Sequence, residues 1–166
     1  SSETDEGQDW VVVPTPDGDG NSFALVNPHS GLSMDMGLTG GKKLIQWMYE
    51  AANENQKFYA QKIEGNDELF ALVSSDASYA VTQSGTALTM NATAAGFSDD
   101  MQFRFVATEK PVPAGIVGYN YVIARQQSPN LVLSNRQSYD TDSRIFADQY
   151  EEDNWGQVWQ IAMAPK

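Results

Sequence analysis

The tetrapeptide FALV occupies residues 23–26 and again residues 70–73, a separation of 47 positions. The ten residues behind each copy, NPHSGLSMDM and SSDASYAVTQ, match in length without a gap. A third and more divergent copy starts 51 positions after the second, with YVIARQQSPNLVLSN at Tyr121, and ends with GQVWQI at 156–161. A unit that recurs at a nearly constant spacing indicates an internal repeat. The chain is therefore expected to use one supersecondary unit three times.

Each unit consists of short apolar runs separated by Gly, Asn, Asp, Ser or Pro. Runs such as LSMDM (32–36), YAVTQ (79–83) and LVLSN (131–135) have the length and composition of β-strands. No stretch keeps the 3.6-residue period of a helix over three turns, and the one helix-like segment, MYEAANENQ (48–56), is too short for more than a single turn. The pattern predicts an all-β chain with about four strands in each unit.

Three four-stranded units that close on one another leave no exposed sheet edge. This is the β-trefoil arrangement, with pseudo-three-fold symmetry, and FALV is then the same core strand in successive lobes. We predict one domain over residues 1–166, with an acidic tail at 1–9 and repeats at about 23–69, 70–120 and 121–166. The symmetry also predicts equivalent buried positions: Phe23, Leu25, Phe58, Leu72, Phe103, Phe105, Val122 and Trp159.

The charge of the chain narrows the class of partner. There are 22 acidic and 10 basic residues, for a net charge of −12. Such a field repels phosphate backbones and anionic lipid surfaces, so neither nucleic acid nor a membrane surface is expected as a partner. The same argument disfavours sialylated and sulfated ligands and favours neutral ones. Oligomeric state leaves no trace in the sequence.

The cysteine count and the ends of the chain exclude further classes. The sequence has no cysteine, which excludes disulfides, thiolate catalysis and cysteine-based zinc sites. No apolar run approaches the ~18 residues of a membrane-spanning helix. The opening SSETDEGQD has neither the basic start nor the apolar core of a signal peptide. A leader already removed and a lost initiator Met would both leave Ser1, so a cytoplasmic and a secreted location both remain open.

The first unit resembles a known lectin repeat. Residues 23–63 include the steps Met34-Asp35-Met36, Ile45-Gln46-Trp47 and Asn55-Gln56-Lys57-Phe58. These resemble the L-D-V, I-Q-W and N-Q-x-W steps of the ricin B-type lectin repeat, also called the QxW repeat. The resemblance covers about 140 residues as three degenerate repeats, and only the first repeat is close.

The resemblance implies a sugar-binding site in the first unit. In that family the residue at Asp35 accepts hydrogen bonds from two neighbouring hydroxyls, Trp47 offers its flat face to the C–H patch of a sugar, and Asn55 both donates and accepts. Gln56 braces the lobe from inside. His29 lies in the loop ahead of Ser30 and Gly31, close to the expected site, where its position allows either a rim contact with the sugar or plain exposure to solvent. Without a sugar we expect the Asp35 carboxylate to face water.

The other two units lack this set. Thr82 aligns with the carboxylate in the second unit, and Ser134 or Asn135 does so in the third. At the position of Asn55 the second unit has Asp100 and the third unit has Gly156. The framework is therefore expected in all three lobes and the sugar-binding set in one.

Two further patterns lead to no metal site. The segment DGDGN (17–21) starts like an EF-hand calcium loop, but Ser22 replaces the required Gly and Pro28 the required Glu, so it is read as an exposed turn. His29 is the only histidine, which leaves no second member for a histidine metal cluster or a catalytic triad. We therefore predict neither metal nor cofactor.

The sequence thus predicts a non-catalytic lectin that recognises neutral mono- or oligosaccharides and glycoconjugates through its first repeat. The acidic pair Glu50 and Glu54 does not indicate a glycosidase. Such an enzyme needs two carboxylates ~5–10 Å apart across a cleft, and nothing in the sequence indicates a cleft between these residues. Two alternatives remain. One is a β-trefoil protein-interaction module such as a protease inhibitor, and the other is the glycan-targeting domain of a larger toxin or glycosidase.

Overall fold

The computed structural model describes residues 22–108 and 120–163. The predicted acidic tail at 1–9 and the DGDGN segment at 17–21 lie outside these residues. Within the described ranges the chain forms β-strands and three single-turn 3-10 helices, and no helix is long and apolar enough to cross a membrane. The expectation of an all-β chain is confirmed.

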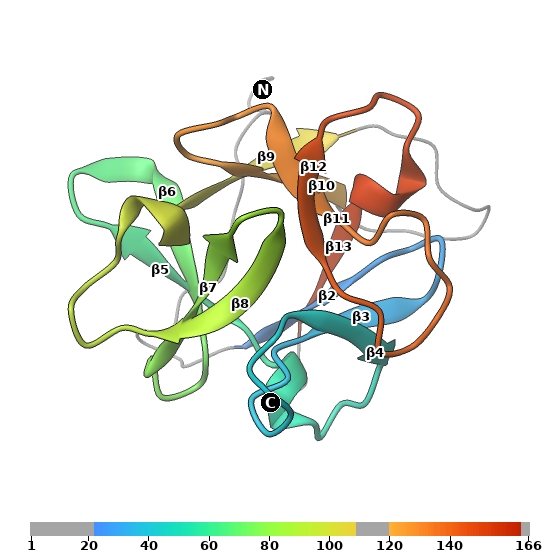
Figure 1. Cartoon of the computed structure of the whole chain (residues 1–166), viewed down its shortest axis with the longest axis horizontal. Coiled ribbons are helices and arrows are strands. Elements are labelled where there is room, and N and C mark those ends of the chain that lie inside the picture. Colours follow the sequence, from blue (N-terminus) through green and yellow to red (C-terminus); the bar gives the residue numbers. More distant parts are fainter. Residues whose placement is uncertain (1–21, 109–119, 164–166) are drawn as a thin grey trace.

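The strands fall into three lobes of the same order, each with a short helix before its last strand (Figure 1). The first lobe comprises β2 (Phe23–Val26), β3 (Leu32–Asp35), β4 (Ile45–Met48), η2 (Glu54–Gln56) and β5 (Tyr59–Ile63). The second comprises β6 (Asn66–Val73), β7 (Tyr79–Ser84), β8 (Ala87–Ala92), η3 (Asp99–Met101) and β9 (Phe103–Thr108). The third comprises β10 (Asn120–Arg125), β11 (Leu131–Ser134), β12 (Phe146–Gln149), η4 (Trp155–Gln157) and β13 (Trp159–Met163).

A ring of backbone hydrogen bonds marks the pseudo-three-fold axis. The amide of Leu44 donates to the carbonyl of Leu88 over 3.1 Å, Leu88 donates to Ile145 over 3.3 Å, and Ile145 donates back to Leu44 over 2.9 Å. All three side chains are fully buried. One residue from each lobe thus completes the same contact with the next lobe, as a β-trefoil requires.

The two FALV runs and the equivalent run of the third lobe, which starts at Tyr121, have the same role. Phe23 bridges Phe58, Phe70 pairs with Phe103, and Tyr121 pairs with Trp159, so the start of each lobe pairs with its last strand. Strand β13 also pairs with β2, which joins the two ends of the described chain and closes the sheet. The predicted three-fold arrangement of four strands is confirmed.

The core is built from the positions that the symmetry predicts. Full burial of such side chains stabilises the fold by roughly 1.5–3 kcal/mol each. The Trp159 indole also satisfies its N–H, which donates to the carbonyl of Leu133 over 3.1 Å. All eight predicted positions are at most 6% exposed: Phe23, Leu25, Phe58, Leu72, Phe103, Phe105, Val122 and Trp159.

Candidate functional site

The hairpin of β3 and β4 places the first predicted site residues. Ser33 lies opposite Trp47, and Asp35, the last residue of β3, lies opposite Ile45. The turn that follows needs Gly37, because its φ is +57° and a Cβ there would lie 2.5 Å from the backbone oxygen of Lys43. This close approach of the two strand ends fixes the backbone next to Asp35.

Asp35 is more enclosed than its sequence context indicates. It is only 5% exposed. Its Oδ1 accepts a hydrogen bond from the amide of Gly37 over 2.8 Å, and its Oδ2 lies 3.4 Å from Nε2 of Gln56. The expectation of a water-facing carboxylate is therefore wrong. An ionised carboxylate has about four acceptor positions, so these two contacts leave capacity for a ligand.

The helix η2 carries Asn55 to the end of β3. The side chain of Asn53 caps this helix and accepts the amide of Asn55 over 2.9 Å. The carbonyl of Asn55 accepts the amide of Met36 over 2.8 Å, and its Oδ1 accepts the amide of Leu38 over 3.3 Å. The Nδ2 group forms no hydrogen bond within the described residues, so it can donate to a ligand.

Gln56 holds the loop between β4 and η2 in place. It is 1% exposed, its Nε2 donates to the carbonyl of Met48 over 2.8 Å, and its Oε1 accepts the amide of Glu50 over 2.8 Å. Both ends of its side-chain amide therefore already form hydrogen bonds within the protein. Its contact with Asp35 places it behind the carboxylate rather than in the opening.

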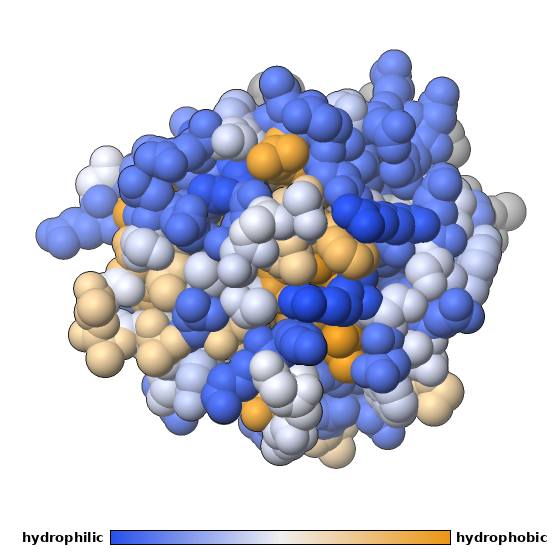
Figure 2. Space-filling model, in the orientation of Figure 1, coloured by the Kyte–Doolittle hydropathy of each residue, from blue (hydrophilic) through white to orange (hydrophobic). Residues whose placement is uncertain are grey.

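Asp35, Trp47 and Asn55 line one open cleft of about 580 Å³. Trp47 is half-buried, so part of the indole remains accessible. Strongly hydrophilic side chains gather near the middle of this face of the molecule (Figure 2). The other lining residues are Gly37, Thr39, Gly40, Lys43, Ile45, Asn53, Asp142 and Arg144.

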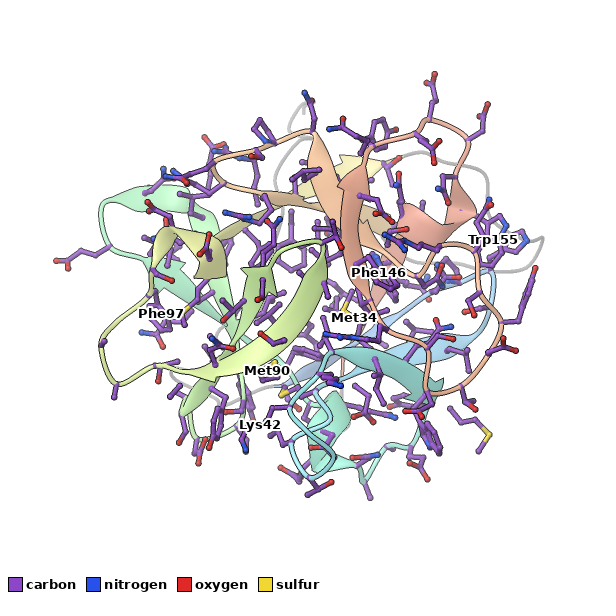
Figure 3. The ribbon with its side chains drawn as sticks, in the orientation of Figure 1. Met34, Lys42, Met90, Phe97, Phe146 and Trp155 are labelled. Atoms are coloured by element: carbon purple, nitrogen blue, oxygen red, sulfur yellow. The ribbon has the colours of Figure 1, made fainter. Side chains whose placement is uncertain are left out.

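His29 lies elsewhere. It is exposed, and its ring stacks on Trp155 with centroids 4.4 Å apart and an interplanar angle of 18°. Tyr139 lies against the same Trp155 at 4.9 Å. Figure 3 shows Trp155 at the outer edge of the molecule, whereas Met34 lies near its middle. The structure therefore brings three predicted residues to the cleft, Gln56 behind it, and His29 to an aromatic cluster on the third lobe.

The second lobe lacks the polar set. Thr82 occupies the position of Asp35, and its hydroxyl donates to the carbonyl of Ala80 over 3.0 Å. The register places Asn91 where the first lobe has Trp47. Met101 fills the position of Gln56. This lobe lacks the carboxylate of Asp35 and the indole of Trp47, and Asp100, at the position of Asn55, pairs with Arg125 over 3.2 Å.

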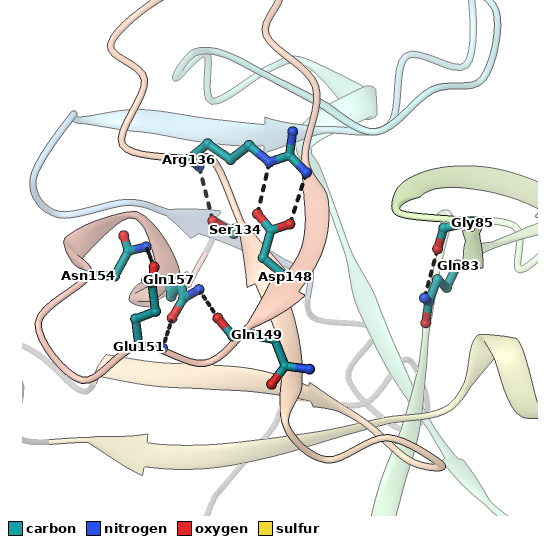
Figure 4. A network of polar contacts seen from close by, with 9 residues as sticks. All are labelled: Gln83, Gly85, Ser134, Arg136, Asp148, Gln149, Glu151, Asn154 and Gln157. Atoms are coloured by element: carbon teal, nitrogen blue, oxygen red, sulfur yellow. Dashed lines mark hydrogen bonds and ion pairs between the residues drawn. The ribbon is translucent and has the colours of Figure 1, made fainter.

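The third lobe repeats the framework (Figure 4). Oε1 of Gln157 accepts the amide of Glu151 over 2.9 Å, and its Nε2 donates to the carbonyl of Gln149 over 2.9 Å. Asn154 caps η4 by accepting the amide of Gly156 over 2.9 Å. These bonds repeat those of Gln56 and its neighbours, so the brace belongs to the fold and does not distinguish a sugar site.

In the third lobe an ion pair replaces the set formed by Asp35 and Trp47. Ser134 takes the position of Asp35 and accepts the amide of Arg136 over 3.0 Å, which settles the alignment between Ser134 and Asn135. Asp148 stands at the position of Trp47 and accepts two hydrogen bonds from Arg136, each 2.9 Å long. These bonds raise the pKa of Arg136 above its ordinary value. The guanidinium lies 3.6 Å from the ring centroid of Phe146 and covers its face.

Gly156 confirms this difference between the lobes. A Cβ at that position would lie 2.5 Å from Oδ1 of Asn135 and 2.6 Å from the amide of Gln137. A side chain like that of Asn55 therefore does not fit in the third lobe.

Glu50 and Glu54 are each engaged outside the cleft. Glu50 accepts a hydrogen bond from Nδ2 of Asn53 over 3.0 Å, and Glu54 pairs with Lys57 over 2.7 Å. Both carboxylates are exposed and neither lines the cleft. Within residues 22–108 and 120–163, no three His, Cys, Asp or Glu side chains gather as a metal site would require.

No family model matches the chain, and no curated protein resembles it in sequence. Solved structures do match. The designed three-fold symmetric protein ThreeFoil is similar with a TM-score of 0.65 and 18% identity, over 85% of this chain and 97% of ThreeFoil. A ricin B-like lectin from Macrolepiota procera, solved with lactose, is similar with a TM-score of 0.66 and 14% identity, over 92% of this chain and 99% of the lectin. The fold is the β-trefoil.

A third match is to part of an enzyme. An exo-β-1,3-galactanase from Clostridium thermocellum is similar with a TM-score of 0.64 and 19% identity, over 87% of this chain but only 30% of the enzyme. The chain thus matches ricin B-like lectins and other β-trefoil structures across most of its length. At these identities the matches establish the fold.

Proposed function

We propose that this chain is a non-catalytic lectin that binds neutral mono- or oligosaccharides and glycoconjugates, mainly through its first lobe. The observation that carries the proposal is the cleft that gathers Asp35, Trp47 and Asn55. The equivalent positions hold Thr82 and Asn91 in the second lobe, and an Arg136–Asp148 ion pair stands in the third. This contrast supports binding at the first lobe.

The three side chains offer complementary chemistry to a sugar ring. The Asp35 carboxylate accepts from hydroxyl groups, the Asn55 amide donates, and the indole of Trp47 packs against C–H groups. A shallow site with so few anchors supports weak binding, with dissociation constants on the order of 10 μM to millimolar.

Two further observations support this function. The Macrolepiota procera protein of the same fold is a lectin solved with lactose. The net charge of −12 favours neutral ligands over sialylated or sulfated ones. The galactanase match, which spans 30% of that enzyme, favours the related possibility that this domain directs a larger glycan-active protein to its substrate.

A glycan array followed by calorimetric titration tests the proposal. We expect neutral glycans to bind in preference to acidic ones. The best array ligand should lose about ten- to a hundred-fold in affinity for Asp35→Asn, which removes a charge-assisted hydrogen bond. Thr82→Ala, at the same place in the second lobe, should bind like the wild type. If no glycan binds, the protein-interaction module becomes the better interpretation.

A further inference from the structure

The cleft continues from the first lobe onto the third. Its lining includes Asp142 and Arg144, which belong to the loop between β11 and β12. Arg144 bridges to Ile45 at the start of β4, the strand that carries Trp47. Asp142 and Arg144 lie outside the motifs of the first repeat. They line the cleft only because the first and third lobes pack against each other.

Buried Gln46 locks this loop onto β4. It is 0% exposed and precedes Trp47 in the chain. All four of its polar groups bond to the third lobe. The side-chain Nε2 donates to the carbonyls of Ser138 (3.0 Å) and Asp140 (2.9 Å), and Oε1 accepts from Nδ2 of Asn135 (3.1 Å). The backbone amide of Gln46 donates to the carbonyl of Ser143 (2.9 Å), and its backbone carbonyl accepts from the amide of Asp142 (2.8 Å). The loop is thus held against the cleft before any ligand arrives.

The side chains that this loop adds have unused hydrogen-bonding capacity. Arg144 makes one hydrogen bond, from Nη2 to the carbonyl of Leu88 over 3.2 Å, and its buried Nε has no partner. In the described part of the chain, neither Asp142 nor Arg144 forms an ion pair. Lys43, on the same cleft, is exposed and also unpaired there. The inter-lobe part of the cleft therefore offers an acceptor and two donors.

We infer that the cleft holds two consecutive residues of a neutral oligosaccharide. Asp35, Trp47 and Asn55 hold the first residue, and Asp142 and Arg144 hold the second. The inference rests on the proposed function and names the ligand as at least a disaccharide. A volume of about 580 Å³ exceeds the needs of one pyranose ring.

The mixed charge of the inter-lobe part favours a neutral second residue. A hydroxyl group both donates and accepts, so it suits a carboxylate beside a guanidinium. An acidic sugar would gain from Arg144 and Lys43 but would approach the carboxylates of both Asp142 and Asp35, so the cleft carries no net attraction for it.

Titration of matched sugars with matched variants tests this inference. The probes are galactose with lactose and mannose with mannobiose. Asp142→Asn keeps the backbone, since the φ of +69° at this residue suits Asn. Asp140→Asn is the control, because it makes the same change of charge in the same loop at a residue that does not line the cleft. Arg144→Gln removes the donor, with Arg104→Gln of the second lobe as its control.

We expect wild-type protein to bind the disaccharide of the preferred pair about tenfold more tightly than its monosaccharide. Asp142→Asn and Arg144→Gln should reduce this gain to less than about threefold, because each removes a contact to the second residue. The two controls should keep the full gain.

Three results would overturn the inference. If the wild type binds the monosaccharide and the disaccharide of each pair equally well, the cleft has no position for a second sugar residue, and the proposed function is left intact. A full gain in both cleft variants places the second residue elsewhere. Failure of every sugar to bind, in these titrations and on the glycan array, removes the proposed function as well.

Discussion

The Asp35 carboxylate makes a structural contact and, under the proposed function, also binds the ligand. Oδ1 accepts the amide of Gly37, whose φ of +57° shapes the turn to Lys43. The remaining acceptor positions belong to the cleft. A substitution at Asp35 therefore changes both stability and binding, and the replacement decides the balance between them.

Asp35→Ala should lower the free energy of unfolding by roughly 1–3 kcal/mol, because it leaves the enclosed amide of Gly37 without an acceptor. Asp35→Asn retains a carbonyl oxygen at this place and should lose less stability. Urea unfolding of the two variants measures the difference. Equal stability of Asp35→Ala and wild type would show that the bond to Gly37 contributes nothing.

The residues that the sequence located share one hairpin and the helix that follows it. Asp35, Trp47 and Asn55 lie within one repeat, so a motif can specify their proximity. The position of His29 in the sequence predicts that it lies near these residues. However, the side chain of Asn27 holds the loop of His29 against the third lobe by donating hydrogen bonds of 2.9 Å to the carbonyls of Trp155 and Val158. Position along a repeat does not reveal which neighbouring lobe a turn will contact.

At the scale of elements, the three short helices use two kinds of brace. Gln56 and Gln157 make the same pair of backbone contacts in the first and third lobes. Met101 of the second lobe instead packs with Ala71 and Val73 in a small apolar cluster. An apolar residue is thus compatible with the helix, provided that the surrounding loop does not rely on an amide.

Gln56→Met should therefore destabilise the first lobe. It orphans the amide of Glu50 and the carbonyl of Met48, with a loss of about 1–3 kcal/mol in the free energy of unfolding. It should also weaken sugar binding, because Gln56 lies behind Asp35.

Gln157→Met is the matched control. It removes the same two kinds of bond in the third lobe, so a similar loss of stability is expected, with glycan affinity unchanged. Thermal unfolding and calorimetric titration of both variants make the comparison. Equal weakening of binding by the two substitutions would contradict a first-lobe site.

At the scale of the whole molecule, the fold was predictable because its core repeats. The equivalent positions Phe58, Phe103 and Trp159 are all fully buried, and such aromatic positions leave a period in the sequence. The loops show no such period. Equivalent pairs of strands are connected by loops of different length, at residues 36–44, 85–86 and 135–145. The inter-lobe part of the cleft comes from the last of these loops and was therefore not predicted.

Under the proposed function, the absence of the polar set from two lobes limits the valency of the protein. Cross-linking of cells requires at least two binding sites on one particle, in a geometry that lets both engage. Asn91 and the Arg136–Asp148 pair take the place of the indole in the second and third lobes. One monomer should therefore have one glycan site.

A protein that is monomeric by light scattering should accordingly bind glycan-coated beads but fail to agglutinate cells. The same protein, biotinylated at a single site and assembled on streptavidin, should agglutinate them, because tethering several weak sites can raise avidity by roughly 10²–10⁴. Assemblies of Asp35→Asn should stay inactive, which ties the effect to the first lobe. Agglutination by the monomer would mean that the second or third lobe also binds, despite Thr82 and Ser134 in place of the carboxylate.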